Sequence, residues 1–121
     1  MKNMTSKLFM SAVLVLSLCG LSSAQTPLVE GDRIVFLGDS ITQAGVGPGG
    51  YVTVTDQTLK ALYPDLHLSV IGAGISGHRV PDCQARLQRD VLNHKPTIVV
   101  IYIGINDVWH STSGRGTSKE D

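Results

Sequence analysis

The sequence predicts an α/β fold built on a parallel β-sheet. Three short apolar runs, each suited to a strand that is buried on both faces, alternate with segments that have helical patterns. Each run is followed closely by a segment that contains glycine and polar residues, as at the strand ends where such sheets bind ligands. The order strand, helix, strand, helix, strand predicts parallel pairing with right-handed crossovers.

The first strand is expected over Arg33–Leu37, where Arg-Ile-Val-Phe-Leu forms a continuous apolar run. Gly38 ends it, because glycine tolerates the backbone angles of a sharp exit from a strand. A glycine-rich loop is expected to follow over Ala44–Gly50.

The next segment, Tyr51–Tyr63, is ambiguous. Its first half, Tyr-Val-Thr-Val-Thr, is typical of a strand, whereas Asp56–Leu62 is typical of a helix. We favour a helix, because Pro64 ends it and the next strand pattern begins at once. That second strand is expected over Leu66–Ile71.

The second helix, expected over Val80–Asn93, has the clearest periodicity in the chain. Three apolar residues recur at i, i+4 and i+8, and we assign the charged residues of this segment to the other faces. The apolar residues are Cys83, Leu87 and Val91, and the charged residues are Arg86, Arg89 and Asp90. The third strand is expected over Thr97–Ile103, and a polar tail follows from His110, in which Thr117–Glu120 fits a helix start.

Residues 1–24 have the pattern of a secretory signal peptide. Lys2 and Lys7 precede an apolar stretch, Leu8–Cys19, and the small residues Ser22 and Ala24 suit cleavage after Ala24. The apolar stretch is shorter than the ~20 residues of a membrane-spanning helix, so a stable membrane anchor is not expected. We therefore expect a secreted or periplasmic protein whose domain occupies residues 25–121.

Composition excludes several classes of function. The chain has ten basic and ten acidic residues and no basic patch, which argues against a nucleic-acid partner. Cys83 is the only cysteine after the signal peptide, so no disulfide within residues 25–121 is expected. The four histidines lack the spacing of metal ligands, and we expect no metal site.

A candidate nucleophile lies in the first segment, Gly38–Thr42, directly after the first strand. Ser40 in Gly-Asp-Ser-Ile-Thr would face the ligand-binding edge of the sheet. A serine after a strand is also a common helix cap. The segment is not the Gly-x-Ser-x-Gly elbow of α/β-hydrolases, because Thr42 stands in place of the last glycine.

The second segment, Gly72–Gly77, allows two interpretations. Its sequence Gly-Ala-Gly-Ile-Ser-Gly matches the dinucleotide-binding pattern through Gly72, Gly74 and Gly77. That pattern normally follows the first strand of its domain, whereas this one follows the second. The alternative is that a glycine N–H here stabilises an oxyanion.

The third segment, Gly104–Asp107, follows the last strand with the sequence Gly-Ile-Asn-Asp. Asn106 and Asp107 are common turn residues. The neutral amide of Asn106 can also donate to a developing oxyanion without adding a negative charge beside it.

Together the three segments resemble the sequence blocks of the SGNH, or GDSL, hydrolase family of esterases and lipases. The resemblance covers Asp32 to about His110. It implies a flavodoxin-like three-layer α/β/α sandwich, with Ser40 as nucleophile and no cofactor. The implied oxyanion hole comprises the Ser40 and Gly74 N–H groups and the Asn106 side chain, and the implied substrate is a small-molecule or polysaccharide ester.

The family's fourth block, Asp-x-x-His near the C-terminus, has no clear counterpart. Asp107-Val108-Trp109-His110 has this spacing, but its aspartate belongs to the third segment. We therefore expect the catalytic histidine and aspartate beyond Asp121, and little activity from this chain alone. A non-catalytic module that binds acyl or sugar groups is the other hypothesis that the residues allow.

Overall fold

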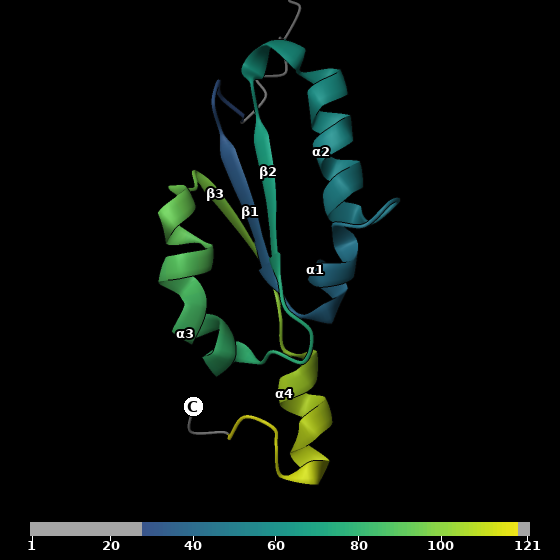
Figure 1. Ribbon diagram of the computed structural model, residues 1–121, viewed down its shortest axis with the longest axis vertical. Helices are drawn as coiled ribbons and strands as arrows, with labels where there is room; N and C mark the ends of the chain where they lie inside the picture. Colours follow the sequence, from purple (N-terminus) through teal and green to yellow (C-terminus); the bar gives the residue numbers. More distant parts are fainter. Residues whose placement is uncertain (1–27, 119–121) are drawn as a thin grey trace, which may run out of the picture.

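The computed structural model describes residues 28–118. In these residues a parallel sheet with strand order β2-β1-β3 lies between two helical layers (Figure 1). Helix α3 covers one face of the sheet, and α1 and α2 cover the other. The strands are β1 (Arg33–Gly38), β2 (Ser69–Gly74) and β3 (Ile98–Tyr102), and the helices are α1 (Ser40–Gly45), α2 (Tyr51–Leu62), α3 (Val80–Asp90) and α4 (Ile105–Trp109). The predicted α/β fold with a parallel sheet is confirmed.

The central strand β1 is apolar throughout because both of its faces are covered. Val35 and Leu37 pack toward α3 in a cluster with Cys83 and Val91. Ile34 and Phe36 alternate with them and pack on the other side against Val52 of α2. This alternation is the period of two that a strand imposes on its side chains.

The ambiguous segment after the glycine-rich loop is a helix, as predicted. The hydroxyl of Thr53 donates to the Val46 carbonyl, and the hydroxyl of Thr55 donates to the Tyr51 carbonyl. These bonds satisfy the threonine hydroxyls inside a helix, although β-branched residues favour strands. Tyr51 also packs edge-to-face against Phe36, with ring centroids 5.5 Å apart, and so attaches the helix to the sheet.

The second strand was predicted over Leu66–Ile71 and is wrong at both ends, since β2 runs from Ser69 to Gly74. Pro64–Leu66 forms a 3₁₀ turn, and His67 has a left-handed backbone with φ of 48°. A strand cannot begin before such a turn is complete. At its other end, β2 continues through the glycines of the second segment because these pair with the last residues of β1.

Three other expectations need correction. The first segment enters helix α1 directly, so the predicted loop from Ala44 is partly helical. Asn106 and Asp107, predicted as turn residues after the third strand, lie on α4, which begins at Ile105. The predicted helix 80–93 ends at Asp90 and continues as a 3₁₀ turn over Leu92–His94.

Two expectations concern residues at the ends of the chain, outside residues 28–118. The signal peptide over residues 1–24 lies outside the described residues, as does the end of the helix start expected at 117–120. No helix between residues 28 and 118 combines the length and hydropathy needed to cross a bilayer.

Candidate active site

The carboxyl ends of β1, β2 and β3 meet at one edge of the sheet, where α1 and α4 begin (Figure 1). Ser40 is the first residue of α1 and is exposed at this edge. The Asp39 carboxylate caps α1 by accepting from the Ile41 N–H at 2.9 Å. The Ser40 N–H therefore belongs to the first turn, where no intrahelical acceptor exists. Among the described residues, no side chain is hydrogen-bonded to the Ser40 hydroxyl.

Gly74 lies beside the first segment, with backbone against backbone. In the β1–β2 register it pairs with Gly38, two residues before Ser40. A Cβ atom at Gly74 would lie 2.1 Å from the Gln43 nitrogen and 2.5 Å from the Thr42 carbonyl carbon. Only glycine permits this contact between β2 and α1, so a packing requirement explains the residue.

The second segment is also hydrogen-bonded to the first. The Ile75 N–H donates to the Gly38 carbonyl at 3.1 Å. The Ser76 N–H donates to Oε1 of Gln43 at 2.6 Å. These bonds fix the position of the loop after β2 relative to the start of α1.

Two side chains attach the third segment to the residues that follow the second segment. Asn106 is buried, and its Nδ2 donates to the His78 carbonyl at 2.9 Å. The Asp107 carboxylate accepts from the Val80 N–H at 3.1 Å and from the Thr117 hydroxyl. The structure thus brings Ser40, Gly74 and Asn106 to the same edge of the sheet.

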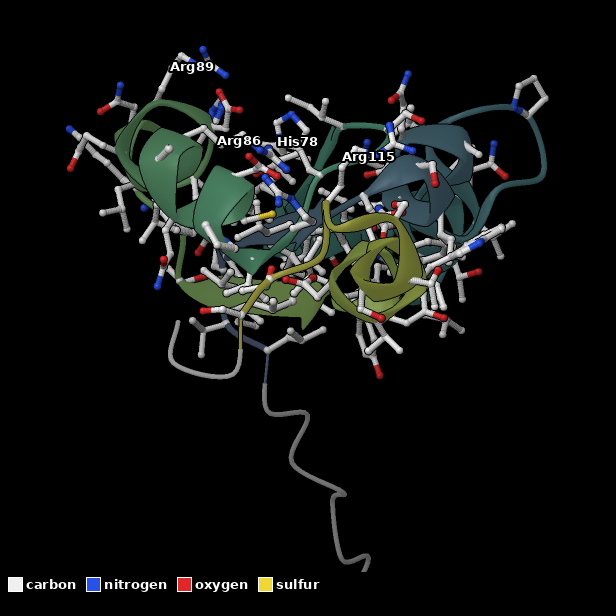
Figure 2. The ribbon with its side chains drawn as sticks, turned by 90° about the horizontal axis from the view of Figure 1, so that it is seen from below. His78, Arg86, Arg89 and Arg115 are labelled. Carbon is white, nitrogen blue, oxygen red and sulfur yellow. The ribbon has the colours of Figure 1, made fainter. Side chains whose placement is uncertain are left out.

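A buried arginine lies behind this edge, where sequence analysis did not expect one. Arg86 of α3 was assigned to a face away from the core, but only 5% of it is exposed. Figure 2 shows its side chain next to His78, whereas Arg89 lies on the outer side of α3. The spacing of apolar residues along a helix predicts which side faces the core. It does not reveal an arginine that is buried because it donates to carbonyls at the ends of two strands.

The charge of Arg86 is balanced by Asp90, one turn later on α3, at 3.1 Å. Hydrogen bonds from Arg89 and from Arg86 lower the pKa of Asp90 to about 2, so it is ionised at neutral pH. Burial raises the pKa of the neighbouring Cys83 thiol, which therefore stays neutral. Cys83 is a free cysteine in the described structure.

The described histidine side chains offer no free general base next to Ser40. Nδ1 of His78 accepts from Nε of Arg86 at 3.0 Å, so the neutral ring carries its proton on Nε2. His67 lies in the turn before β2, at the opposite end of the sheet from Ser40, and His94 lies in the 3₁₀ turn after α3.

A cavity of about 380 Å³ opens beside the second segment. It is lined by Gly77, Arg79, Asp82 and Arg115. Arg79 donates to Asp82 and lowers the pKa of that carboxyl, while its Nη1 donates to the Arg115 carbonyl. Within residues 28–118, no group of three His, Cys, Asp or Glu side chains is placed to hold a metal ion.

The geometry argues against the dinucleotide interpretation of the second segment. In that motif, the diphosphate lies at the N-terminus of the helix that follows the glycines. Here the first N–H groups of α3 face carboxylates, because Asp107 accepts from Val80 and Asp82 accepts from Arg79. Gly72 and Gly74 pack against the first helical layer, where an added Cβ would meet Val46 or the Thr42–Gln43 backbone, so this packing accounts for both glycines without a phosphate.

The model of the GDSL-like lipase/acylhydrolase family matches residues 36–120, a span that contains all three segments. The chain belongs to this family. An acetylxylan esterase from Geobacillus stearothermophilus is 44% identical over 91 residues, which cover 66% of this chain and 42% of that protein. The crystal structure of the acetyl xylan esterase AlAXEase superposes with a TM-score of 0.67 and 45% identity, over 73% of this chain and 45% of that one.

A further relative of this GDSL-like chain is the uncharacterized lipoprotein YqeF of Bacillus subtilis. It is 39% identical over 49 residues, which cover 40% of this chain and 20% of that protein. The chain spans less than half the length of each of these relatives.

Proposed function

We propose that this chain carries the nucleophile and the oxyanion hole of an exported carboxylic ester hydrolase. Ser40 is the nucleophile, and the Ser40 and Gly74 N–H groups and the Asn106 amide are the oxyanion donors. The observation that carries this proposal is the convergence of the three segments at one sheet edge, where Ser40 is exposed and where Gly74 and Asn106 lie on the other two segments. Membership of the GDSL-like family supports it.

In the proposed reaction, Oγ of Ser40 attacks the acyl carbon of the ester. The carbonyl π electrons move onto oxygen, and the three donors stabilise that charge. Collapse of the intermediate breaks the bond to the alcohol, which leaves with the proton taken from Ser40. Water then attacks the acyl-enzyme in the same way and releases the acid.

The proton carrier is proposed to come from outside the described side chains. Nδ1 of His78 is occupied by Arg86, and no described side chain bonds to the Ser40 hydroxyl. A serine without an adjacent base is a weak nucleophile at neutral pH. We therefore assign the proton transfer to the histidine of the family's Asp-x-x-His block, in residues that follow the described chain.

We propose an acetylated polysaccharide, or an oligosaccharide from it, as the substrate. Two relatives that share about 45% identity with this chain are named acetylxylan esterases. The full-length protein is expected to release acetate from acetylated xylooligosaccharides. With aryl esters, kcat/KM is expected to fall as the acyl chain lengthens from two to eight carbons. A preference for the longer chains would contradict the substrate assignment and leave the esterase assignment in place.

We also propose that residues 1–24 are a cleaved signal peptide and that 25–121 belong to the esterase domain. The relative YqeF is named a lipoprotein, which agrees with an exported protein. N-terminal sequencing of the protein recovered from the medium or periplasm is expected to begin at Gln25. A mature protein that retains Lys2 would contradict export by this route.

A further inference from the structure

Arg86 uses every donor that a guanidinium has. An arginine has five N–H groups in a rigid plane, and each has an acceptor here within 3.4 Å. Nε donates to His78, Nη1 donates to the Ala73 carbonyl and to Asp90, and Nη2 donates to the Gly38 carbonyl and to Cys83. The longest of these contacts, 3.4 Å, is to the Cys83 sulfur.

Three of these acceptors are connected to the proposed oxyanion donors: two lie in the first and second segments, and the third directly follows the second segment. The Gly38 carbonyl, at 2.8 Å, lies two residues before Ser40. The Ala73 carbonyl, at 2.9 Å, belongs to the peptide unit that also contains the Gly74 N–H. The third acceptor is His78, whose own carbonyl holds the Asn106 amide. Each proposed donor is thus linked to one planar cation.

We infer that Arg86 is a positioning residue that sets the relative placement of the three oxyanion donors. The inference rests on the proposed function of Ser40, Gly74 and Asn106. A guanidinium suits this role because its fork fixes the angles between the groups it binds. The acceptors come from the end of β1, the end of β2 and the loop before α3, so one side chain links all three in addition to the backbone pairing of β1 with β2.

The burial of Arg86 is better explained by the groups that it positions than by its packing in the core. Burying a cation costs several kcal/mol of desolvation, and apolar residues of similar volume often stabilise a protein more. Next to Cys83, an apolar side chain at this position would extend the cluster around α3. The buried charge of Arg86 is therefore better explained by the strand ends that it binds than by the stability it adds.

The kinetic test compares Arg86→Lys with Cys83→Ala in the full-length protein. Lysine keeps the charge but has three donors and no fork, so it cannot hold all the acceptors. We expect kcat to fall about 10-fold to 100-fold with KM nearly unchanged, because oxyanion donors act chiefly in the transition state. Cys83→Ala removes the weakest acceptor, which is not connected to an oxyanion donor, and is expected to leave kcat unchanged. An unchanged kcat in folded Arg86→Lys would overturn the inference.

A double-mutant cycle with Asn106→Ala separates positioning from general loss of structure. If Arg86 acts by placing the donors, Arg86→Lys costs less in the Asn106→Ala background than in the wild type. Fully additive losses would show that Arg86 acts elsewhere. If Arg86→Lys does not fold, His78→Ala is combined with Asn106→Ala in the same way. His78→Ala removes only the hydrogen bond that Nε of Arg86 donates to the His78 ring. Additive losses in that cycle would equally overturn the inference.

Amide NMR spectra give a measurement that does not depend on activity. In Arg86→Lys, the backbone amides of Ser40 and Gly74 and the side-chain amide of Asn106 are expected to shift together, and Cys83→Ala is expected to move them little. If the three signals stay in place, the positioning role is wrong whether or not the protein is an esterase. If they move but no hydrolysis depends on Ser40, the positioning stands and the proposed function fails.

Discussion

Substitution Ser40→Ala is expected to lower kcat for ester hydrolysis by the full-length protein by about 10⁴-fold to 10⁶-fold. Removing the hydroxyl removes the atom that forms the acyl-enzyme, whereas the oxyanion donors and the bound substrate remain. KM is therefore expected to change little. The measurement is the hydrolysis of an acetyl aryl ester, followed at saturating substrate by release of the aryl alcohol.

The matched control is Ser69→Ala, which removes a serine hydroxyl at the start of β2, at the opposite end of the sheet. It is expected to keep wild-type kcat. A fluorophosphonate probe gives the same comparison by covalent capture, which should fail in Ser40→Ala alone. If Ser40→Ala hydrolyses and is captured like the wild type, Ser40 is not the nucleophile. If instead the wild type neither hydrolyses the ester nor is captured by the probe, the alternative of a module that binds acyl or sugar groups without turnover gains support.

The second large effect is expected when the 121-residue polypeptide is compared with the full-length protein. The polypeptide is expected to hydrolyse the same ester at least about 10³-fold more slowly, because Ser40 has no described base and loss of a triad member removes several orders of magnitude. The comparison uses folded, monomeric polypeptide. Monomer must be checked because Ile101 and Trp109 are 63% and 71% exposed, and such apolar surface promotes association.

Turnover by the polypeptide at a rate near that of the full-length protein would contradict this account. Provided that Ser40→Ala abolishes this turnover, the base must lie within the 121 residues. His78→Ala and His110→Ala would then identify it. A loss in His78→Ala as large as that in Ser40→Ala, beyond the loss expected from positioning alone, would show that the ring gives up its bond to Arg86 during the reaction.

The fold was largely predictable because its signals are local and repeated. The continuous apolar run of β1 predicted a strand that is buried on both faces. In the structure, α3 covers one face and α2 covers the other. The start of β2 was not predictable from the apolar run, because a 3₁₀ turn at Pro64–Leu66 and a left-handed residue at His67 delay it. The position of Asn106 on a helix instead of in a turn was missed because α4 has only five residues, too few for a helical pattern to show.

The candidate site was predictable where residue type and strand order suffice. Ser40, Gly74 and Asn106 each follow or end a strand, and parallel strands share one carboxyl edge. Arg86 was missed because it is buried against carbonyls of β1 and β2. The residue pattern of α3 carries no information about those carbonyls. The close contact of Gly74 with α1 was equally invisible, because it depends on how a helix lies over a strand.

The central claim is that Ser40, Gly74 and Asn106 form one nucleophile and oxyanion site. The most direct measurement is a crystal structure of the full-length protein after reaction with a small alkyl fluorophosphonate. Phosphorus is expected to be bonded to Oγ of Ser40, with the phosphoryl oxygen about 2.7–3.1 Å from the Ser40 nitrogen, the Gly74 nitrogen and Nδ2 of Asn106. An adduct on another residue, or a phosphoryl oxygen that turns away from Gly74 and Asn106, would contradict this claim.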